Sequence, residues 1–295
     1  MRSILDLVGN TPLVDITKVI SKPSVTVYGK LEGQNPGGSV KDRAAYGMIK
    51  GALDRGEIQP GGLRLIEATS GNTGIALAMI ARLFDLDITL LMPDNSTAER
   101  VQTMRAFGAE VILTPADKGG IEYSRELADE MVAQGGYFML NQFANPDNWE
   151  AHYTTTGPEI WRDTAGKVTH FVSSMGTTGT IMGTSRYLKE QNSNIQIVGV
   201  QPTDGSSIPG IRRWTPEYLP KIFEPQRVDQ VIDVSEAEAT QMMKRLAKED
   251  GIFGGMSSGG AVAAAGKLLK TIDEGVIVCI ICDRGDRYLS SGIFE

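Results

Sequence analysis

The sequence has no apolar segment long enough to cross a membrane. The longest apolar run lies around residues 276–281, far short of the ~20 residues that a membrane span needs. Residues 1–6 also lack the apolar stretch and small-residue cleavage site of a secretory signal. We therefore expect a cytoplasmic protein without a membrane partner.

Negatively charged residues outnumber positively charged ones. The 295 residues include 29 Lys and Arg against 36 Asp and Glu, a net charge of -7, and no basic tract stands out. Nucleic-acid binding needs a surface that neutralises phosphates, so no nucleic-acid partner is expected. The composition is otherwise ordinary for a globular protein, and small molecules are the expected partners.

Cysteine and histidine are nearly absent. Cys279 and Cys282 are the two cysteines, and both lie in residues 276–282, which read as a buried strand. Residues three apart on a strand face opposite sides, so neither a redox disulfide nor a metal site is expected. Cys279 should lie in the core, whereas Cys282, at the strand's end, could face a cleft. His152 and His170 belong to no motif and are interpreted as structural.

Short apolar segments rich in β-branched residues alternate with helical patterns. This alternation predicts parallel sheets with right-handed helical crossovers, an α/β fold. A chain of 295 residues has room for two lobes. Predicted strands cover residues 64–68, 88–92, 110–113, 170–173, 196–201 and 276–282, and predicted helices begin near residues 73, 98, 121 and 180.

In such sheets ligands bind beyond the carboxyl ends of the strands, and three loops have unusual chemistry. The first, residues 35–43, precedes a predicted helix at 44–53. Ser39 is a candidate N-cap, which places Lys41 in the first turn, where the helix dipole disfavours another positive charge. A lysine with a lowered pKa suits imine formation. Taken alone, this loop also fits a solvated surface lysine.

The second loop, residues 69–74, reads Thr-Ser-Gly-Asn-Thr-Gly between a predicted strand and a helix. Small hydroxyl residues and glycines at a helix N-terminus expose several N–H donors to one point. The loop is therefore a candidate cradle for a carboxylate or phosphate. An N-capping turn that binds nothing is the alternative for this loop in isolation.

The third loop, residues 174–180, reads Ser-Met-Gly-Thr-Thr-Gly-Thr and leads from a predicted strand into a helix. It has neither the lysine of a Walker loop nor the G-x-G-x-x-G of dinucleotide folds. A phosphate monoester fits it better than a nucleotide. A tight turn with capping residues is the alternative.

Across essentially its whole length the sequence resembles the cysteine synthase family, type B, the β-replacement branch of the fold-type II pyridoxal-phosphate (PLP) enzymes. Ordered motifs with appropriate spacing carry the resemblance. They are residues 9–13 (Gly-Asn-Thr-Pro-Leu), 30–32 (Lys-Leu-Glu), 38–43 (Gly-Ser-Val-Lys-Asp-Arg), 69–74, 176–180 and 255–259 (Gly-Met-Ser-Ser-Gly).

The resemblance implies a role for each loop. Lys41 is the catalytic residue and holds PLP as a Schiff base, and Asn72 hydrogen-bonds the ring hydroxyl. The cofactor phosphate is held by Gly176, Thr177, Thr178, Gly179 and Thr180. The substrate carboxylate is bound by Thr69, Ser70, Gly71 and Thr73, helped by Gln142.

Ser257 is implied to face the pyridine nitrogen. A neutral hydroxyl does not force that nitrogen to carry a proton, so the ring is a weaker electron sink and elimination of the β-substituent is favoured over transamination. The adjacent Ser258 is an alternative for this role. A capping turn ahead of a helix at residues 261–269 is the structural alternative for both.

The resemblance further implies two lobes and a homodimer. Residues 1–12 and 36–146 form a smaller, mobile lobe for the substrate carboxylate, and residues 13–35 and 147–295 form a larger lobe for the cofactor phosphate. Closure of the small lobe keeps water from the reaction.

The implied reaction converts O-acetyl-L-serine and sulfide into L-cysteine and acetate through an aminoacrylate, with Lys41 as general base. Residues 206–214 and 282–288 resemble type B, whose members accept thiosulfate as well, which gives S-sulfocysteine. Arg212 or Arg213 would attract that anion, although ordinary surface arginines are an equal alternative.

Other functions stay open at this point. An enzyme that uses O-phosphoserine and a cystathionine β-synthase-like enzyme share the fold and the lysine chemistry. Serine or threonine dehydratases and serine racemase are disfavoured by the complete motif at residues 38–43. A catalytically silent protein that keeps the fold is disfavoured by the intact loops, and a nucleotide-binding Rossmann protein by the missing fingerprint.

Overall fold

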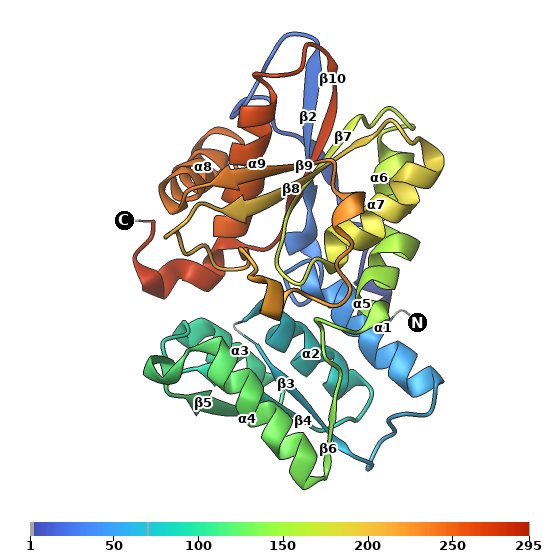
Figure 1. The fold of residues 1–295 in the computed structure, drawn as a ribbon, viewed down its shortest axis with the longest axis vertical. Coiled ribbons are helices and arrows are strands. Elements are labelled where there is room, and N and C mark those ends of the chain that lie inside the picture. Colours follow the sequence, from blue (N-terminus) through green and yellow to red (C-terminus); the bar gives the residue numbers. More distant parts are fainter. Residues whose placement is uncertain (1–2, 70, 295) are drawn as a thin grey trace.

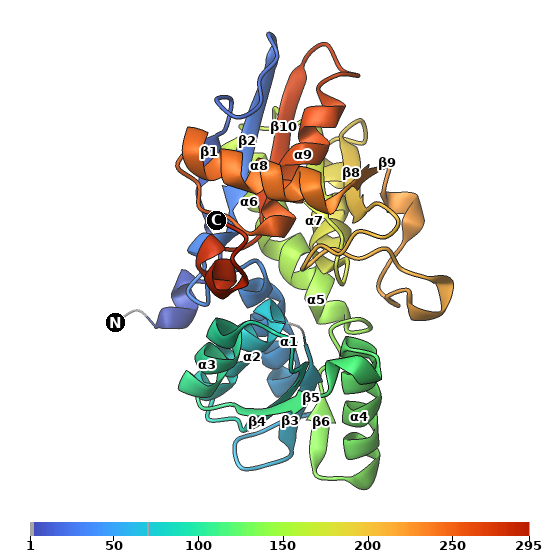
Figure 2. The same ribbon diagram turned by 90° about the vertical axis from the view of Figure 1, so that its left-hand side faces the viewer.

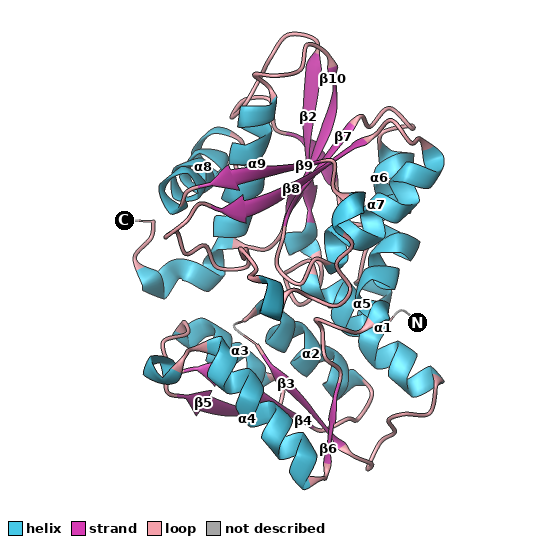
Figure 3. Cartoon of the chain, viewed as in Figure 1, coloured by secondary structure: helices cyan, strands magenta, loops and turns pink. Residues whose placement is uncertain are grey.

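The larger of two sheets has six strands in the order β1-β2-β10-β7-β8-β9. β1 runs antiparallel to β2 and all other neighbours are parallel. Figures 1 and 3 show the fold as a computed structural model of the protein, which describes residues 3–69 and 71–294. The strands are β1 (Leu13–Asp15), β2 (Val25–Leu31), β7 (His170–Ser174), β8 (Gln196–Pro202), β9 (Gln230–Val234) and β10 (Gly275–Ile281).

The smaller sheet has four parallel strands in the order β5-β4-β3-β6. In Figure 1 it lies below the larger sheet, on the far side of the loops that connect the two. Its strands are β3 (Arg64–Ala68), β4 (Ile88–Pro93), β5 (Glu110–Thr114) and β6 (Tyr137–Met139).

Helices cover both faces of each sheet because alternate strand residues are apolar on both sides. In the larger sheet, α8 (Glu236–Glu249) and α9 (Met256–Leu268) share one hydrophobic cluster with the strands, and α6 (Gly157–Asp163) and α7 (Gly179–Gln191) share the other. Around the smaller sheet, helices α1 (Lys41–Asp54), α2 (Asn72–Leu83) and α3 (Ala98–Ala106) lie on one face and α4 (Ile121–Gln134) on the other (Figure 2). A short helix, α5 (Pro146–Ala151), packs against α1 and α7.

Strand β10 shows this two-sided burial most clearly. Cys279 packs in the cluster with α8 and α9, whereas Cys282 belongs to the cluster with α6 and α7. The two thiols therefore lie on opposite faces, as their spacing predicts, and both are free and buried. Burial raises the pKa of the Cys282 thiol to about 12, so at neutral pH it carries its proton.

The predicted α/β architecture is confirmed, and every predicted strand is present. Three helices begin earlier than expected, at Lys41, Asn72 and Met256, because the motif residues themselves form the first turns. Strands β1, β2, β6 and β9 were not predicted. Two of them have only three residues, too few to show a period.

Among residues 3–69 and 71–294, no helix combines the length and apolarity that a membrane span needs. The limits predicted for the two lobes stay a prediction.

Candidate active site

A cavity of about 670 Å³ lies where carboxyl ends of strands from both sheets meet. Its walls come from the loops after β3, β4, β7, β8 and β10 and from the start of α1, the region where open α/β sheets bind ligands. Of the site residues predicted from the sequence, the cavity is lined by Lys41, Thr69, Gly71, Asn72, Thr73, Gln142, Gly176, Thr177, Thr180, Arg212, Arg213 and Ser257. Thr178 and Gly179 lie behind this surface, and Ser70 lies outside the described residues.

Lys41 is the first residue of α1 and is therefore in the first helical turn, as predicted. Ser39 is not the N-cap, since Val40 occupies that position, but its hydroxyl accepts a hydrogen bond from the Lys41 amide at 3.2 Å. Burial lowers the pKa of the Lys41 amine, against the opposing pull of negative charge at Asp283. A lysine that loses its proton easily is suited to nucleophilic attack on a carbonyl.

The hydroxyl of Thr69 stabilises the conformation of the loop after β3. Thr69 Oγ1 accepts hydrogen bonds from the amides of Gly71 and Gly74, both at 3.2 Å. Gly71 has a φ of +156°, and a Cβ there would meet Arg100 Nε at 2.7 Å. Thr73 Oγ1 donates to Gln142 Oε1 at 2.8 Å. The loop and the glutamine that the sequence assigned to the substrate carboxylate are therefore in direct contact.

A buried carboxylate holds Gln142 in place. Glu67 on β3 accepts hydrogen bonds from the amides of Asn141 at 2.9 Å and Gln142 at 3.4 Å. Burial raises the pKa of Glu67 to about 7, and those two amides only partly oppose the shift. Sequence reasoning did not find Glu67, because it reads as an ordinary polar residue within a short strand.

The loop after β7 has the backbone of an anion site. Thr178 precedes α7 with a left-handed φ of +71°, and Thr177 Oγ1 accepts hydrogen bonds from Asn148 Nδ2 at 3.1 Å and Gly179 N at 3.4 Å. A Cβ at Gly179 would overlap Asn148 at 1.9 Å. Within the described residues, Thr178 Oγ1 is buried without a hydrogen-bond partner. A phosphate at this helix N-terminus fits, since its oxygens would accept from the hydroxyl and the free N–H groups.

The two serines at the start of α9 have different surroundings. Both lie inside the first turn of a helix that begins at Met256, so the expected capping turn ahead of residue 261 is wrong. Ser258 is fully buried, and its hydroxyl accepts a hydrogen bond from the amide of Cys282 at 2.9 Å. Ser257 lines the cavity. The geometry therefore favours Ser257 over Ser258 as the serine that faces a ligand.

Arg212 and Arg213 both line the cavity but differ in their partners. Arg213 forms ion pairs with Asp204 at 3.2 Å and Asp233 at 2.8 Å. Within the part of the chain that the structure describes, Arg212 has one ion pair, a longer one with Glu122 at 3.4 Å. Arg212 is therefore the arginine more available to an anion.

His152 lies closer to the site than its isolation in the sequence suggested. Its ring contacts Thr156 Oγ1 at 2.8 Å and Thr180 Oγ1, in the phosphate loop, at 3.3 Å. Burial, reinforced by the positive charge of Arg43, lowers the pKa of His152 to about 3, so the ring is neutral. His170 is the first residue of β7, at the end of the strand away from the cavity.

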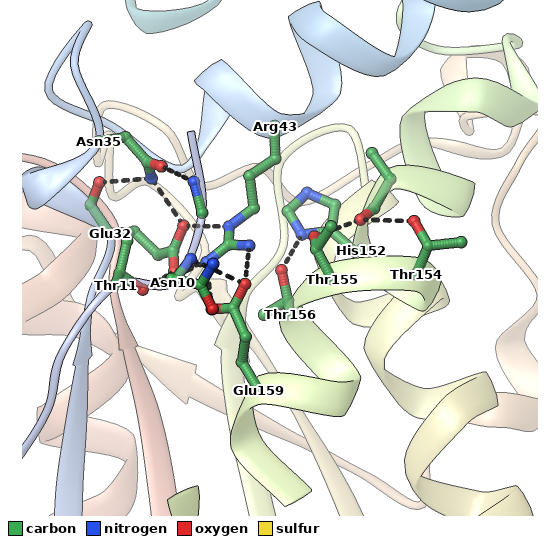
Figure 4. Close-up of polar contacts among 12 residues, drawn as sticks. Asn10, Thr11, Glu32, Asn35, Arg43, His152, Thr154, Thr155, Thr156 and Glu159 are labelled. Atoms are coloured by element: carbon green, nitrogen blue, oxygen red, sulfur yellow. Dashed lines mark hydrogen bonds and ion pairs between the residues drawn. The ribbon is translucent and has the colours of Figure 1, made fainter. Parts of the chain in front are cut away.

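A buried ionic cluster lies next to the lysine helix (Figure 4). Arg43 binds both Glu32 oxygens, at 2.7 and 2.8 Å, and both Glu159 oxygens, at 2.7 Å each. Lys30 pairs with Glu159 at 2.8 Å, and Thr11 Oγ1 donates to Glu32 at 2.6 Å. Burial alone would raise the pKa of Glu159, but hydrogen bonds from Arg43 outweigh it and lower the pKa to about 2. The sequence motifs contained four of these residues, all but Glu159, without indicating that they meet.

The fold and the cavity define a class of protein. The two sheets place a desolvated lysine beside one loop suited to bind a phosphate and another suited to bind a carboxylate. This arrangement suits an enzyme that holds an aldehyde cofactor on the lysine. The model of the pyridoxal-phosphate dependent enzyme family matches residues 4–283.

Known proteins give the narrower assignment. Cysteine synthase B of Pseudomonas aeruginosa is 60% identical, covering 99% of this chain and 97% of the relative, and cysteine synthase B of Escherichia coli is 57% identical, covering 100% and 96%. Among solved structures, a cysteine synthase from Entamoeba histolytica has a TM-score of 0.93 at 37% identity, covering 100% of this chain and 90% of that one. An O-ureido-L-serine synthase has a TM-score of 0.93 at 35% identity, covering 100% and 95%.

The chain therefore belongs to the pyridoxal-phosphate dependent enzymes, and within them to the cysteine synthase family, where its high-identity relatives are of type B. The resemblance inferred from the motifs and the cofactor it implied, PLP, are confirmed. The cofactor is expected in the described cavity, where Gly176, Thr177 and Thr180 line the wall at the start of α7 and fit its phosphate.

The raised pKa of Glu67 gives a testable pH dependence. Between pH 4.5 and about 7 the unfolded chain releases this proton while the folded chain keeps it, so stability falls as pH rises through this window. Glu67→Gln removes this contribution, which is on the order of 3 kcal/mol. We expect the urea midpoint of the variant to fall less between pH 5 and pH 8 than that of the wild type. Urea midpoints that fall equally in the two proteins between pH 5 and pH 8 would contradict the raised pKa of Glu67.

Proposed function

We propose that this chain makes L-cysteine and acetate from O-acetyl-L-serine and sulfide. The observation that carries the proposal is the convergence, in one cavity, of Lys41 with the loops after β3 and β7. The high-identity relatives named cysteine synthase B support the same reaction.

The loops after β3 and β7 bind different groups. The start of α2 and Gln142 bind the substrate carboxylate, with Thr73 and Gln142 already joined at 2.8 Å. The residues from Gly176 to Thr180 hold the cofactor phosphate, and Asn72 donates to the ring hydroxyl.

PLP, when bound, withdraws electrons from the substrate's α-carbon. Lys41 Nζ would hold the cofactor in the resting enzyme and would be free to act as a base once the substrate is bound. Its Nζ then accepts the proton from Cα, and acetate leaves Cβ with the electron pair of the broken C–O bond. Sulfide bonds to Cβ, and Lys41 Nζ returns a proton to Cα. The lowered pKa of Lys41 suits the proton-accepting step.

Ser257 is the proposed partner of the cofactor's ring nitrogen. Its hydroxyl is neutral, so it does not hold a proton on that nitrogen as a carboxylate would. The resulting weaker electron withdrawal favours loss of the β-substituent over transamination.

The first experiment replaces Lys41 with alanine. We expect Lys41→Ala to lose cysteine formation from O-acetylserine and sulfide by at least about a thousandfold, since base and cofactor anchor are the same group, while the unfolding midpoint changes little. Lys50→Ala, an exposed lysine on the same helix paired with Asp54, is the control and keeps full activity. Undiminished turnover by the Lys41 variant would overturn the proposal.

The wild-type protein tests the alternative functions. Wild-type protein that binds PLP but is inactive would indicate a catalytically silent member of the fold. An assay with O-phosphoserine as donor tests the O-phosphoserine-using enzyme, and an assay with homocysteine as acceptor tests the cystathionine β-synthase-like enzyme.

We further propose that thiosulfate is also accepted, which gives S-sulfocysteine, and that Arg212 attracts this dianion. Support comes from the resemblance to type B and from the weak ion pairing of Arg212, at 3.4 Å to Glu122. Arg213 is less suited because Asp204 and Asp233 already neutralise it.

Replacement of the arginine separates the two sulfur donors. We expect Arg212→Met to raise the KM for thiosulfate about tenfold, as the loss of one charge-assisted contact predicts, and to change the KM for sulfide less than twofold. Arg213→Met is the control, with a smaller effect on thiosulfate. Equal changes for both donors would contradict the role of Arg212, and no turnover of thiosulfate by the wild type would remove this proposal alone.

The resemblance also supports a cytoplasmic homodimer in which the lobe at residues 1–12 and 36–146 closes on the substrate. A sedimentation mass equal to one chain would contradict the dimer.

A further inference from the structure

Arg287 lies in the 3₁₀ segment Gly285–Ser291, which follows β10. Its side chain is buried, with 7% of the residue exposed. The guanidinium donates one hydrogen bond to Asn72 Oδ1 and another to the carbonyl of Gly37. One side chain from the C-terminal segment therefore contacts both the first residue of α2 and the loop that leads into Lys41.

The glycine in the lysine motif is shaped around this guanidinium. Gly38 has a φ of +82°, and a Cβ there would meet Arg287 Nη2 at 2.5 Å. The position of Arg287 thus explains why this part of the motif excludes a side chain.

Residues at the start of α3, which packs on the smaller sheet, hold the backbone around Arg287. Thr97 Oγ1 donates to the Arg287 carbonyl at 3.2 Å, and the Ser290 amide and hydroxyl donate to Glu99 at 2.8 and 2.6 Å. Arg100 lies over the Tyr288 ring at 4.8 Å. The guanidinium is therefore a preorganised donor, not a mobile surface group.

Arg287 also determines which way the Asn72 amide points. An arginine has donors and no acceptor, so the oxygen of the amide must face it. The Asn72 nitrogen then points the other way, where it donates to Asp283 Oδ2 at 2.7 Å. Tyr288 holds that same carboxylate oxygen at 2.7 Å. Loss of Arg287 would leave the orientation of the amide to its contact with Asp283 alone.

We infer that Arg287 is a positioning residue that acts through Asn72, by holding the amide so that the N–H group not bound to Asp283 is available to the ring hydroxyl of PLP. The inference rests on the proposed role of Asn72 at the cofactor. Arg287 itself does not line the cavity, so it has no direct contact with the cofactor or the substrate to lose.

A double-mutant cycle tests this inference by the affinity for PLP, measured with apoprotein by visible absorbance. We expect Arg287→Leu to weaken PLP binding about tenfold and to shift the absorption maximum of the bound cofactor, which reports on hydrogen bonding at the ring hydroxyl. In an Asn72→Ala background the same change should weaken binding less than threefold and leave the maximum where Asn72→Ala puts it. Equal losses in the two backgrounds would show a purely structural role and overturn the inference.

Two further variants keep the test decisive. Arg284→Leu, three residues earlier, removes an exposed arginine that pairs with Asp286 at 3.1 Å, and its PLP affinity should match the wild type. If Arg287→Leu does not fold, as judged by thermal unfolding, Arg287→Lys carries the cycle, because a lysine has one nitrogen in place of the planar fork whose two nitrogens separately reach Asn72 and Gly37. An unchanged affinity and absorption maximum in the lysine variant would also count against the inference.

The PLP measurements do not depend on cysteine formation. A wild-type protein that shows the coupling between Arg287 and Asn72 but makes no cysteine would remove the proposed function alone. A protein that makes cysteine while the two substitutions act additively would remove this inference alone.

Discussion

Arg43 lies between two carboxylates, Glu32 and Glu159, at the point where the lysine helix meets the larger sheet. Both carboxylates are bound through both oxygens, so the guanidinium of a buried arginine is almost fully paired. Lys30 balances the second carboxylate, which makes the cluster neutral overall. Removal of one partner from such a cluster typically costs about 3–5 kcal/mol, because it leaves a buried charge without compensation. The cluster therefore fixes the register of α1 against β2 and α6.

The position of Lys41 follows from that constraint. Lys41 is two residues before Arg43 and is the first residue of the same helix, so the arginine that is fixed in the core also fixes where the amine emerges into the cavity. The amine enters a cavity that is lined in part by the N-termini of α2, α7 and α9. Those N-termini carry partial positive charge and free N–H groups, which suits an anionic cofactor and an anionic substrate and disfavours a protonated lysine.

Burial controls the protonation of several groups around the cavity in the same direction. It favours the neutral form of Lys41, His152 and Glu67. The charged groups that persist in the interior are those with paired partners, above all Arg43 and Glu159. Lys30, Glu32, Arg43 and Glu159 do not line the cavity, so the structural ion pairs and the reaction use different side chains.

The sequence by itself determined the α/β architecture, the two anion-type loops, the lysine in the first turn of a helix and the family. These features depend on residues close together in the chain: the apolar period of strands and helices, and glycines and threonines at helix starts. Only the tertiary structure decided that Ser257 and not Ser258 faces the cavity, and that His152 contacts Thr180. It alone also brought Glu159 to Arg43 and Arg287 to Asn72, which are 116 and 215 residues apart. Such pairs arise when separately formed elements pack against each other, and no local pattern records which buried polar side chains will then meet.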